Sequence, residues 1–157
     1  MGRLKVAITL DATPDEVWHD ISDIASHVEW MEDAVAIEFT SHRSSGVGTT
    51  FDCDTAIGPF RLTDHMEITR WIPGREMGVR HVGMVTGSGV FTLTPVREGR
   101  RRRGRGPAAQ TRFVWTERLT FPWYFGGPIG AFVARPVLRR VWRRNLSNLQ
   151  ARFARST

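Results

Sequence analysis

The C-terminal part of the chain constrains the fold most, because residues 128–155 have the apolar spacing of one long helix. The apolar stripe of this helix consists of Ile129, Phe132, Val133, Val137, Val141, Trp142, Leu146, Leu149 and Phe153. Arginine occupies most of the other positions. A long helix with one apolar stripe needs a broad apolar surface to cover. An antiparallel sheet with one apolar face provides such a surface.

The preceding segments have the patterns expected of that sheet. Apolar residues alternate with polar or small ones between residues 3 and 10, at Leu4, Val6, Ile8 and Leu10. Six further strands are expected between turn residues, at 34–42, 49–57, 60–71, 76–83, 89–96 and 112–121. The short connections favour a meander of antiparallel hairpins. The expected fold class is therefore α+β, with a seven-stranded antiparallel sheet and one long C-terminal helix.

The period of the pattern changes after the first strand. Thr13 is expected to cap a helix, with Pro14 at its first position and Glu16 completing a capping box. Apolar residues continue at helical spacing to about Ile24, and a second short helix is expected at 27–32. Two short helices therefore follow the first strand.

Length and composition exclude several classes of protein. A chain of 157 residues fits a single domain spanning 1–157. Its one cysteine, Cys53, excludes an internal disulfide framework and a multi-cysteine zinc site. Charged residues interrupt every apolar stretch before the length of about 20 residues that a spanning helix needs. The N-terminus lacks the apolar core of a signal peptide, so a cytoplasmic location is expected.

Charge is distributed unevenly along the chain. Residues 1–78 contain 6 basic and 14 acidic side chains, whereas residues 79–157 contain 16 basic and 2 acidic ones. The arginine-rich segment at 97–111 has little apolar content with which to pack, so it is expected to be a mobile hairpin loop. Its charge could meet the phosphates of nucleic acid or anionic lipid. The alternative is that the loop and the basic outer face of the helix are simply solvated, because runs of charged residues usually face water.

Several local motifs accompany this order of elements. They are the segment 12–18 at the first helix, Trp30 in the second, 72–75 after the fourth strand, and 126–130 and 144–149 in the last helix. Together they resemble the START-like, helix-grip (SRPBCC) superfamily, and in particular its bacterial polyketide cyclase/dehydrase-type branch. The resemblance implies a curved sheet wrapped on the long helix, with a hydrophobic ligand cavity between them. Its members include enzymes and carriers, so the fold alone does not determine the activity.

Strand alternation selects three polar candidates for the cavity wall. Glu117 shares a strand face with Phe113, Trp115 and Leu119. Asp64 shares one with Leu62, Met66 and Ile68, and His81 alternates with Met77 and Val79. A carboxyl group on an apolar wall is expected to have a raised pKa unless an arginine pairs with it. In the alternative interpretation, Glu117 lies at the wet end of its strand, Asp64 faces water at a bulge and His81 is structural.

The apolar part of the predicted ligand-binding wall comes from the same inner faces. The residues expected there are Trp30, Phe51, Cys53, Met66, Val79, Phe91, Phe113, Trp115 and Phe132. Trp30 and Trp115 could stack on a flat ligand, although either could equally be part of the core. No metal is expected, because the five histidines are scattered without ligand spacing, and no sequence motif indicates a cofactor.

The leading functional hypothesis is binding of a hydrophobic small molecule that is polyketide-like, aromatic or lipidic. If the protein is an enzyme, cyclisation or dehydration is expected. Glu117 or Asp64 would then remove a proton beside a carbonyl, and His81 would hydrogen-bond the enolate oxygen. The alternative is a lipid carrier or membrane-contact protein that uses the basic helix and the aromatic segment 121–128 on an anionic membrane surface. Nucleic acid is a less favoured partner because no reading motif accompanies the arginines. Both a monomer and a homodimer remain open.

Overall fold

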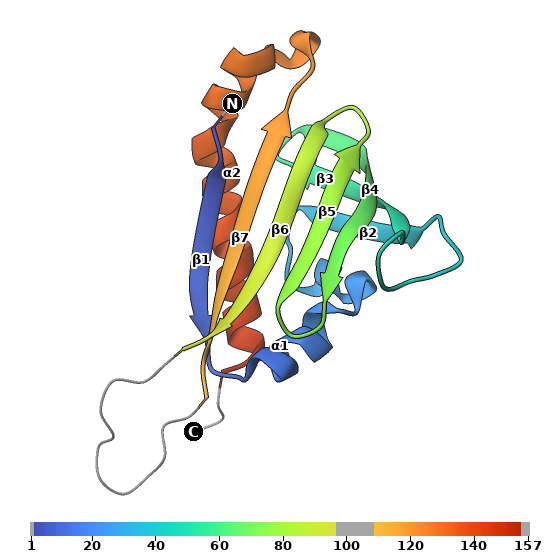
Figure 1. Ribbon diagram of the computed structural model, residues 1–157. Coiled ribbons are helices and arrows are strands. Elements are labelled where there is room, and N and C mark those ends of the chain that lie inside the picture. Colours follow the sequence, from blue (N-terminus) through green and yellow to red (C-terminus); the bar gives the residue numbers. More distant parts are fainter. Residues whose placement is uncertain (1, 97–108, 155–157) are drawn as a thin grey trace, which may run out of the picture.

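A computed structural model of the protein describes residues 2–96 and 109–154. Figure 1 shows a curved sheet with one long helix on its concave side. The strands are β1 (Leu4–Leu10), β2 (Ala34–Phe39), β3 (Thr50–Ile57), β4 (Phe60–Ile72), β5 (Glu76–Val82), β6 (Thr86–Pro95) and β7 (Thr111–Thr120). The helices are α1 (Pro14–Ile21) and α2 (Gly127–Arg152), together with the short 3₁₀ turns η1 (Ile24–Glu29) and η2 (Trp123–Phe125).

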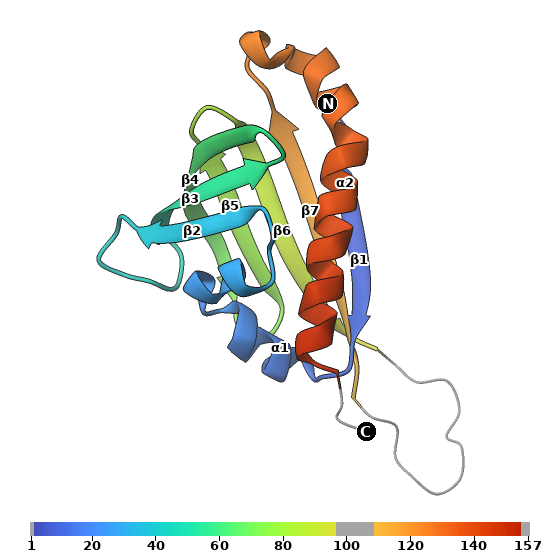
Figure 2. The ribbon, with the colours of Figure 1, turned by 180° about the vertical axis from the view of Figure 1, so that it is seen from behind.

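The described strands form one antiparallel sheet in the order β1-β7-β6-β5-β4-β3-β2. Helix α2 packs along β1 and β7, while the β2 edge curves away from it beyond η1 (Figure 2). This arrangement confirms the predicted helix-grip fold. Residues 97–108 of the predicted arginine-rich loop lie outside the described residues. Thr111, which was expected to belong to the loop, begins β7.

The first helix begins as predicted. The Thr13 hydroxyl accepts a hydrogen bond from the backbone N–H of Glu16 at 3.1 Å, and the Glu16 carboxylate accepts one from the backbone N–H of Thr13 at 2.7 Å. The second helix differs from the prediction, because it is a 3₁₀ turn that begins at Ile24 rather than at 27. The buried His27 side chain donates from Nε2 to the Ile21 carbonyl at 2.7 Å, which ties this turn closely to the end of α1.

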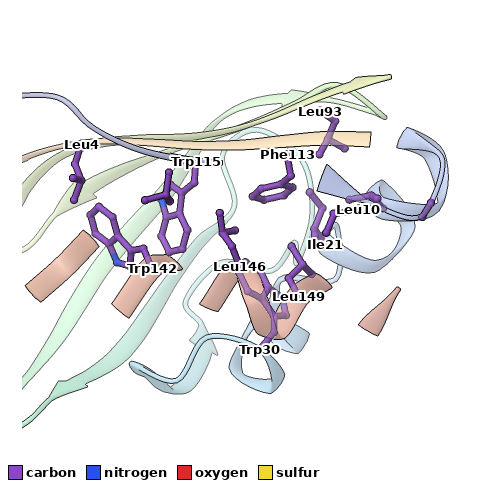
Figure 3. Close-up of a cluster of buried hydrophobic side chains, with 13 residues drawn as sticks. Leu4, Leu10, Ile21, Trp30, Leu93, Phe113, Trp115, Trp142, Leu146 and Leu149 are labelled. Carbon is purple, nitrogen blue, oxygen red and sulfur yellow. The ribbon is translucent and has the colours of Figure 1, made fainter. Parts of the chain in front are cut away.

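The main hydrophobic core lies where the C-terminal half of α2 meets β1 and β7 (Figure 3). Trp142, Leu146 and Leu149 are buried there, which confirms the predicted phase of this half of the helix. The Trp142 ring stacks on Trp115, with ring centroids 5.0 Å apart and planes inclined by 22°.

Most of the predicted apolar stripe on the N-terminal half of α2 is exposed, so this part of the prediction was wrong. Ile129, Phe132, Val133 and Val137 are 76%, 73%, 65% and 51% exposed. The reason lies in the curvature of the sheet: Val133 and Val137 border a cavity between the helix and the strands instead of packing on the strands.

Candidate functional site

A cavity of about 510 Å³ lies between the concave face of the sheet, η1 and the N-terminal half of α2. Its wall is almost entirely apolar, with side chains from η1, from β2 to β7 and from α2. Six of the predicted wall residues lie on it, namely Phe51, Cys53, Met66, Val79, Phe91 and Trp115. Burial raises the pKa of Cys53 to about 11, so its thiol is uncharged at neutral pH.

The three other predicted wall residues lie elsewhere. Trp30 and Phe113 are fully buried in the main core and contact each other edge to face, with centroids 6.5 Å apart. They lie at the end of the sheet where α1 and the last turns of α2 already fill the concave side. Phe132 points instead toward a neighbouring hollow of about 240 Å³, lined also by Leu4 and Arg135. Its position on the helix turns it away from the cavity side.

The three predicted polar residues come together on the cavity wall. His81 Nδ1 lies 2.6 Å from Asp64 Oδ2, and His81 Nε2 lies 3.2 Å from Glu117 Oε2. All three side chains are at least nine-tenths buried. They form one hydrogen-bonded cluster on β4, β5 and β7, hereafter the Asp64–His81–Glu117 cluster.

Strand register brings these residues together although they are far apart in the sequence. His81 on β5 is opposite Met66 on β4, two residues from Asp64. Glu117 on β7 is opposite Gly89 on β6, which leaves only that glycine between it and β5. A Cβ at Gly89 would collide with the Glu117 carboxylate. The absent side chain is therefore what allows Glu117 to reach across β6 to His81.

The two carboxylates of the cluster are not equally satisfied. Glu117 Oε1 accepts a hydrogen bond from Trp115 Nε1 at 3.0 Å, in addition to the bond from His81 to Oε2. Asp64 Oδ1, by contrast, is buried and has no hydrogen-bond partner among the described residues. A buried acceptor left without a donor costs about 1–3 kcal/mol. Asp64 is therefore the member of the cluster that can still accept a hydrogen bond.

His81 is the cationic member of the cluster. Burial by itself lowers the pKa of His81, but hydrogen bonds to Asp64 and Glu117, together with their negative charges, raise it to about 10. At neutral pH both ring nitrogens therefore carry a proton, and each donates to one carboxylate. The partner of Glu117 is thus an imidazolium and not an arginine.

This geometry changes the expected role of His81. Both of its nitrogens already donate within the cluster, so neither N–H remains for an enolate oxygen. Asp64 is left as the group with a free oxygen, and His81 and Glu117 hold it in place. The cluster can therefore accept a proton or a hydrogen bond at Asp64.

Two further titratable residues on the wall, His27 and Asp33, were not predicted. Burial lowers the pKa of His27, which leaves it neutral. Burial raises the pKa of Asp33, whose Oδ1 accepts a hydrogen bond from Asn145 Nδ2 at 2.6 Å. Asn145, a polar residue three positions from Trp142 on the buried side of α2, was the signal in the sequence that a polar partner faces it.

Two kinds of feature are absent from the part of the chain that the structure describes. In residues 2–96 and 109–154, no group of three or more His, Cys, Asp or Glu side chains could hold a metal ion. No helix within those same ranges is long and apolar enough to cross a membrane.

Similar structures share the whole architecture at low sequence identity. The protein TTHA0849 from Thermus thermophilus is 15% identical with a TM-score of 0.75, covering 97% of each chain. A conserved protein from Geobacillus kaustophilus is 17% identical with a TM-score of 0.74, covering 97% of this chain and 95% of the other. A START superfamily protein from Mycobacterium smegmatis is 8% identical with a TM-score of 0.70, covering 96% of each.

A search of the curated proteins finds no match. A family model described as polyketide cyclase / dehydrase and lipid transport, however, matches residues 1–154. This match covers nearly the whole chain and agrees with the helix-grip architecture. The chain therefore belongs to the polyketide cyclase / dehydrase and lipid transport family.

Proposed function

We propose that the protein binds a largely apolar small molecule, polyketide-like, aromatic or lipidic, inside the cavity between the sheet and α2. The observation that carries this proposal is the cavity of about 510 Å³, which has an apolar wall and one buried polar cluster. This size and this lining are typical of small-molecule sites. Family membership and fold both support hydrophobic ligand binding.

Filling the cavity should weaken binding without unfolding the protein. Val79 lies on the wall, whereas Val82 on the same strand is 51% exposed and lies outside the wall. We expect Val79→Trp to weaken binding of the neutral fluorescent probe N-phenyl-1-naphthylamine at least tenfold, because the indole occupies the ligand's space. Val82→Trp, the matched control, should leave its affinity unchanged. Equal affinity in the two folded variants would show that the probe binds elsewhere.

The reaction that the cluster could serve is cyclisation or dehydration of a bound polyketide. A chain held folded in the cavity loses conformational freedom, and a base beside one of its carbonyl groups can then remove a proton. Asp64 is the group for this role, because one of its oxygens has no partner among the described residues. Native mass spectrometry of protein purified from its own host tests the ligand class: a retained polyketide or flat aromatic supports this assignment, and a phospholipid supports a carrier.

A second candidate function, exchange of ligand at an anionic membrane, is favoured by an exposed apolar surface at one end of α2. This apolar tip consists of Trp123, Tyr124, Phe125, Ile129, Phe132, Val133 and Val137, all at least 41% exposed. Phe125, Val133 and Val137 also line the cavity, so the tip borders its opening. No charged residue occurs between Arg118 and Arg135.

Arginines follow directly after the apolar tip along α2. Arg139, Arg140 and Arg143 form no ion pair within the part of the chain that the structure describes. An aromatic tip followed by unpaired arginines suits an interface where acyl chains meet anionic headgroups.

Vesicle binding tests this second function. The double variant Trp123→Ser/Phe132→Ser should bind about tenfold less to phosphatidylcholine vesicles that contain phosphatidylglycerol, because it loses apolar surface at the interface. Val35→Ser, which changes an exposed apolar residue on β2, is the control. If the unaltered protein sediments with neither these vesicles nor pure phosphatidylcholine and instead elutes as a dimer that the double variant disrupts, the tip is an interface between copies of this chain.

A further inference from the structure

The polar cluster has two acidic side chains, Asp64 and Glu117, and only one basic side chain, His81. The two hydrogen bonds that join Asp64, His81 and Glu117 contain two protons. Two ionised carboxylates and a doubly protonated imidazole have a net charge of −1. Moving either proton along its hydrogen bond redistributes this charge but does not change the sum.

Nothing else described on the cavity wall compensates this charge. The described wall includes no lysine and no arginine side chain. His27 donates its Nε2 proton to the Ile21 carbonyl and is neutral. Asp33 adds a further carboxyl group, and its side-chain partner Asn145 is uncharged. The polar part of the cavity is therefore a region of negative potential surrounded by apolar side chains.

Among the carboxylate oxygens of the cluster, only one lacks a hydrogen-bond donor within the described residues. Both oxygens of Glu117 accept hydrogen bonds, from His81 and from Trp115. Asp64 has one such bond, and its Oδ1 has no donor among the described residues. The Asp64 side chain is nine-tenths buried and lies on the cavity face of β4 together with Met66 and Ile68. A ligand that brings a donor to Asp64 would satisfy this oxygen and offset the charge at the same time.

We propose that the cavity selects apolar ligands whose polar end donates a hydrogen bond, with an ammonium group preferred over a hydroxyl, and that it discriminates against carboxylates, with Asp64 as the receiving group. The proposal rests on the proposed function, because it names the chemical class of the ligand bound in the same cavity. It distinguishes this cavity from one built for lipophilic anions, in which a cation on the wall would complement the charge of the ligand.

A matched series of pyrene probes tests the proposal. 1-Pyrenemethylamine, 1-pyrenemethanol and 1-pyrenecarboxylate share one ring system and differ at the polar end. Binding is measured by energy transfer from tryptophan to pyrene at pH 7. The expected order of affinity is amine, then alcohol, then carboxylate, with the amine at least tenfold tighter than the carboxylate.

Substitution of the receiving group tests its role. Asp64→Asn keeps the shape and removes the charge, so it should reduce the amine-to-carboxylate affinity ratio at least tenfold. Asp52→Asn is the control, because Asp52 lies on the neighbouring strand and pairs at 2.5 Å with His65, both outside the cavity wall. This control should leave the ratio unchanged.

The outcomes distinguish the inference from the function on which it rests. A carboxylate probe that binds as tightly as the amine, or an unchanged ratio in folded Asp64→Asn, overturns the inference and leaves ligand binding intact. Failure of all three probes and of neutral N-phenyl-1-naphthylamine overturns the proposed function itself. If Asp64→Asn does not fold, the order of the three probes on the unaltered protein decides the inference.

Discussion

Replacement of His81 by glutamine is expected to lower the free energy of unfolding by about 3–5 kcal/mol at pH 7. The imidazolium is the cation that compensates the buried carboxylates of Asp64 and Glu117. Glutamine can donate hydrogen bonds but carries no charge, so two carboxylates would remain buried close together. Urea unfolding followed by circular dichroism measures the loss.

A matched control is available on the neighbouring strand. His65 also pairs with a carboxylate, that of Asp52 at 2.5 Å, but its side chain is 53% exposed. His65→Gln should therefore lower the free energy of unfolding far less than His81→Gln does, because water screens an exposed pair. If both variants lost the same free energy of unfolding, burial would not strengthen the contribution of the His81 charge to stability.

The same interaction predicts how stability depends on pH. The pKa of His81 is 6.5 in the unfolded chain and about 10 in the folded protein. The folded state therefore binds this proton more tightly, and the associated stability, up to about 5 kcal/mol, is complete below pH 6.5 and is lost as pH rises toward 10. The free energy of unfolding should fall over this range, and the fall should be much smaller in His81→Gln. A flat profile in the unaltered protein would contradict a charged His81.

The second large effect is expected at the tryptophan pair of the core. Trp142→Ala should lower the free energy of unfolding by about 3–5 kcal/mol, because it removes a ring that is 5% exposed and stacked on Trp115. Denaturant titration at constant pH measures the change. Phe132→Ala on the same helix is the control, since Phe132 is 73% exposed, and it should cost well under 1 kcal/mol. A costly Phe132→Ala would mean that the apolar tip is covered in solution.

Local patterns in the sequence predict most of the architecture. Alternation predicts all seven described strands to within three residues at each end, and the capping residues predict the start of α1. The stripe of α2 is predicted correctly around Trp142 and Leu146 but not around Ile129 and Phe132. Apolar spacing identifies one side of a helix, but it does not show whether a sheet, a cavity or solvent faces that side. That depends on the curvature of the sheet, which arises from contacts between distant strands.

Strand alternation selects the three side chains of the Asp64–His81–Glu117 cluster, but it does not predict the hydrogen bonds that join them. Asp64 and Glu117 stand out because each interrupts an apolar strand face. Their link through His81 depends on the register of four strands, including a shift between Ile68 and Arg70 in the pairing of β4 with β5. Register follows from packing across the sheet, which alternation within one strand does not determine. Phe113 shares its face with Glu117 but lies in the core, because a strand face extends beyond the end of the cavity.

The position of β1 has a consequence for the order in which the protein folds. β1 and β2 are consecutive strands, yet they form opposite edges of the sheet, and Leu4 on β1 is opposite Glu117 on β7. The strands from β2 to β6 can pair successively with their neighbours as they leave the ribosome, whereas β1 must wait for the last strand. Closing so long a loop is slow, and contacts of this separation are typical of proteins that fold in milliseconds to seconds. β7 is the partner strand of β1 and also carries Glu117, which hydrogen-bonds to His81. A nascent chain therefore adds its edge strand β1 and completes the buried Asp64–His81–Glu117 cluster in the same late step.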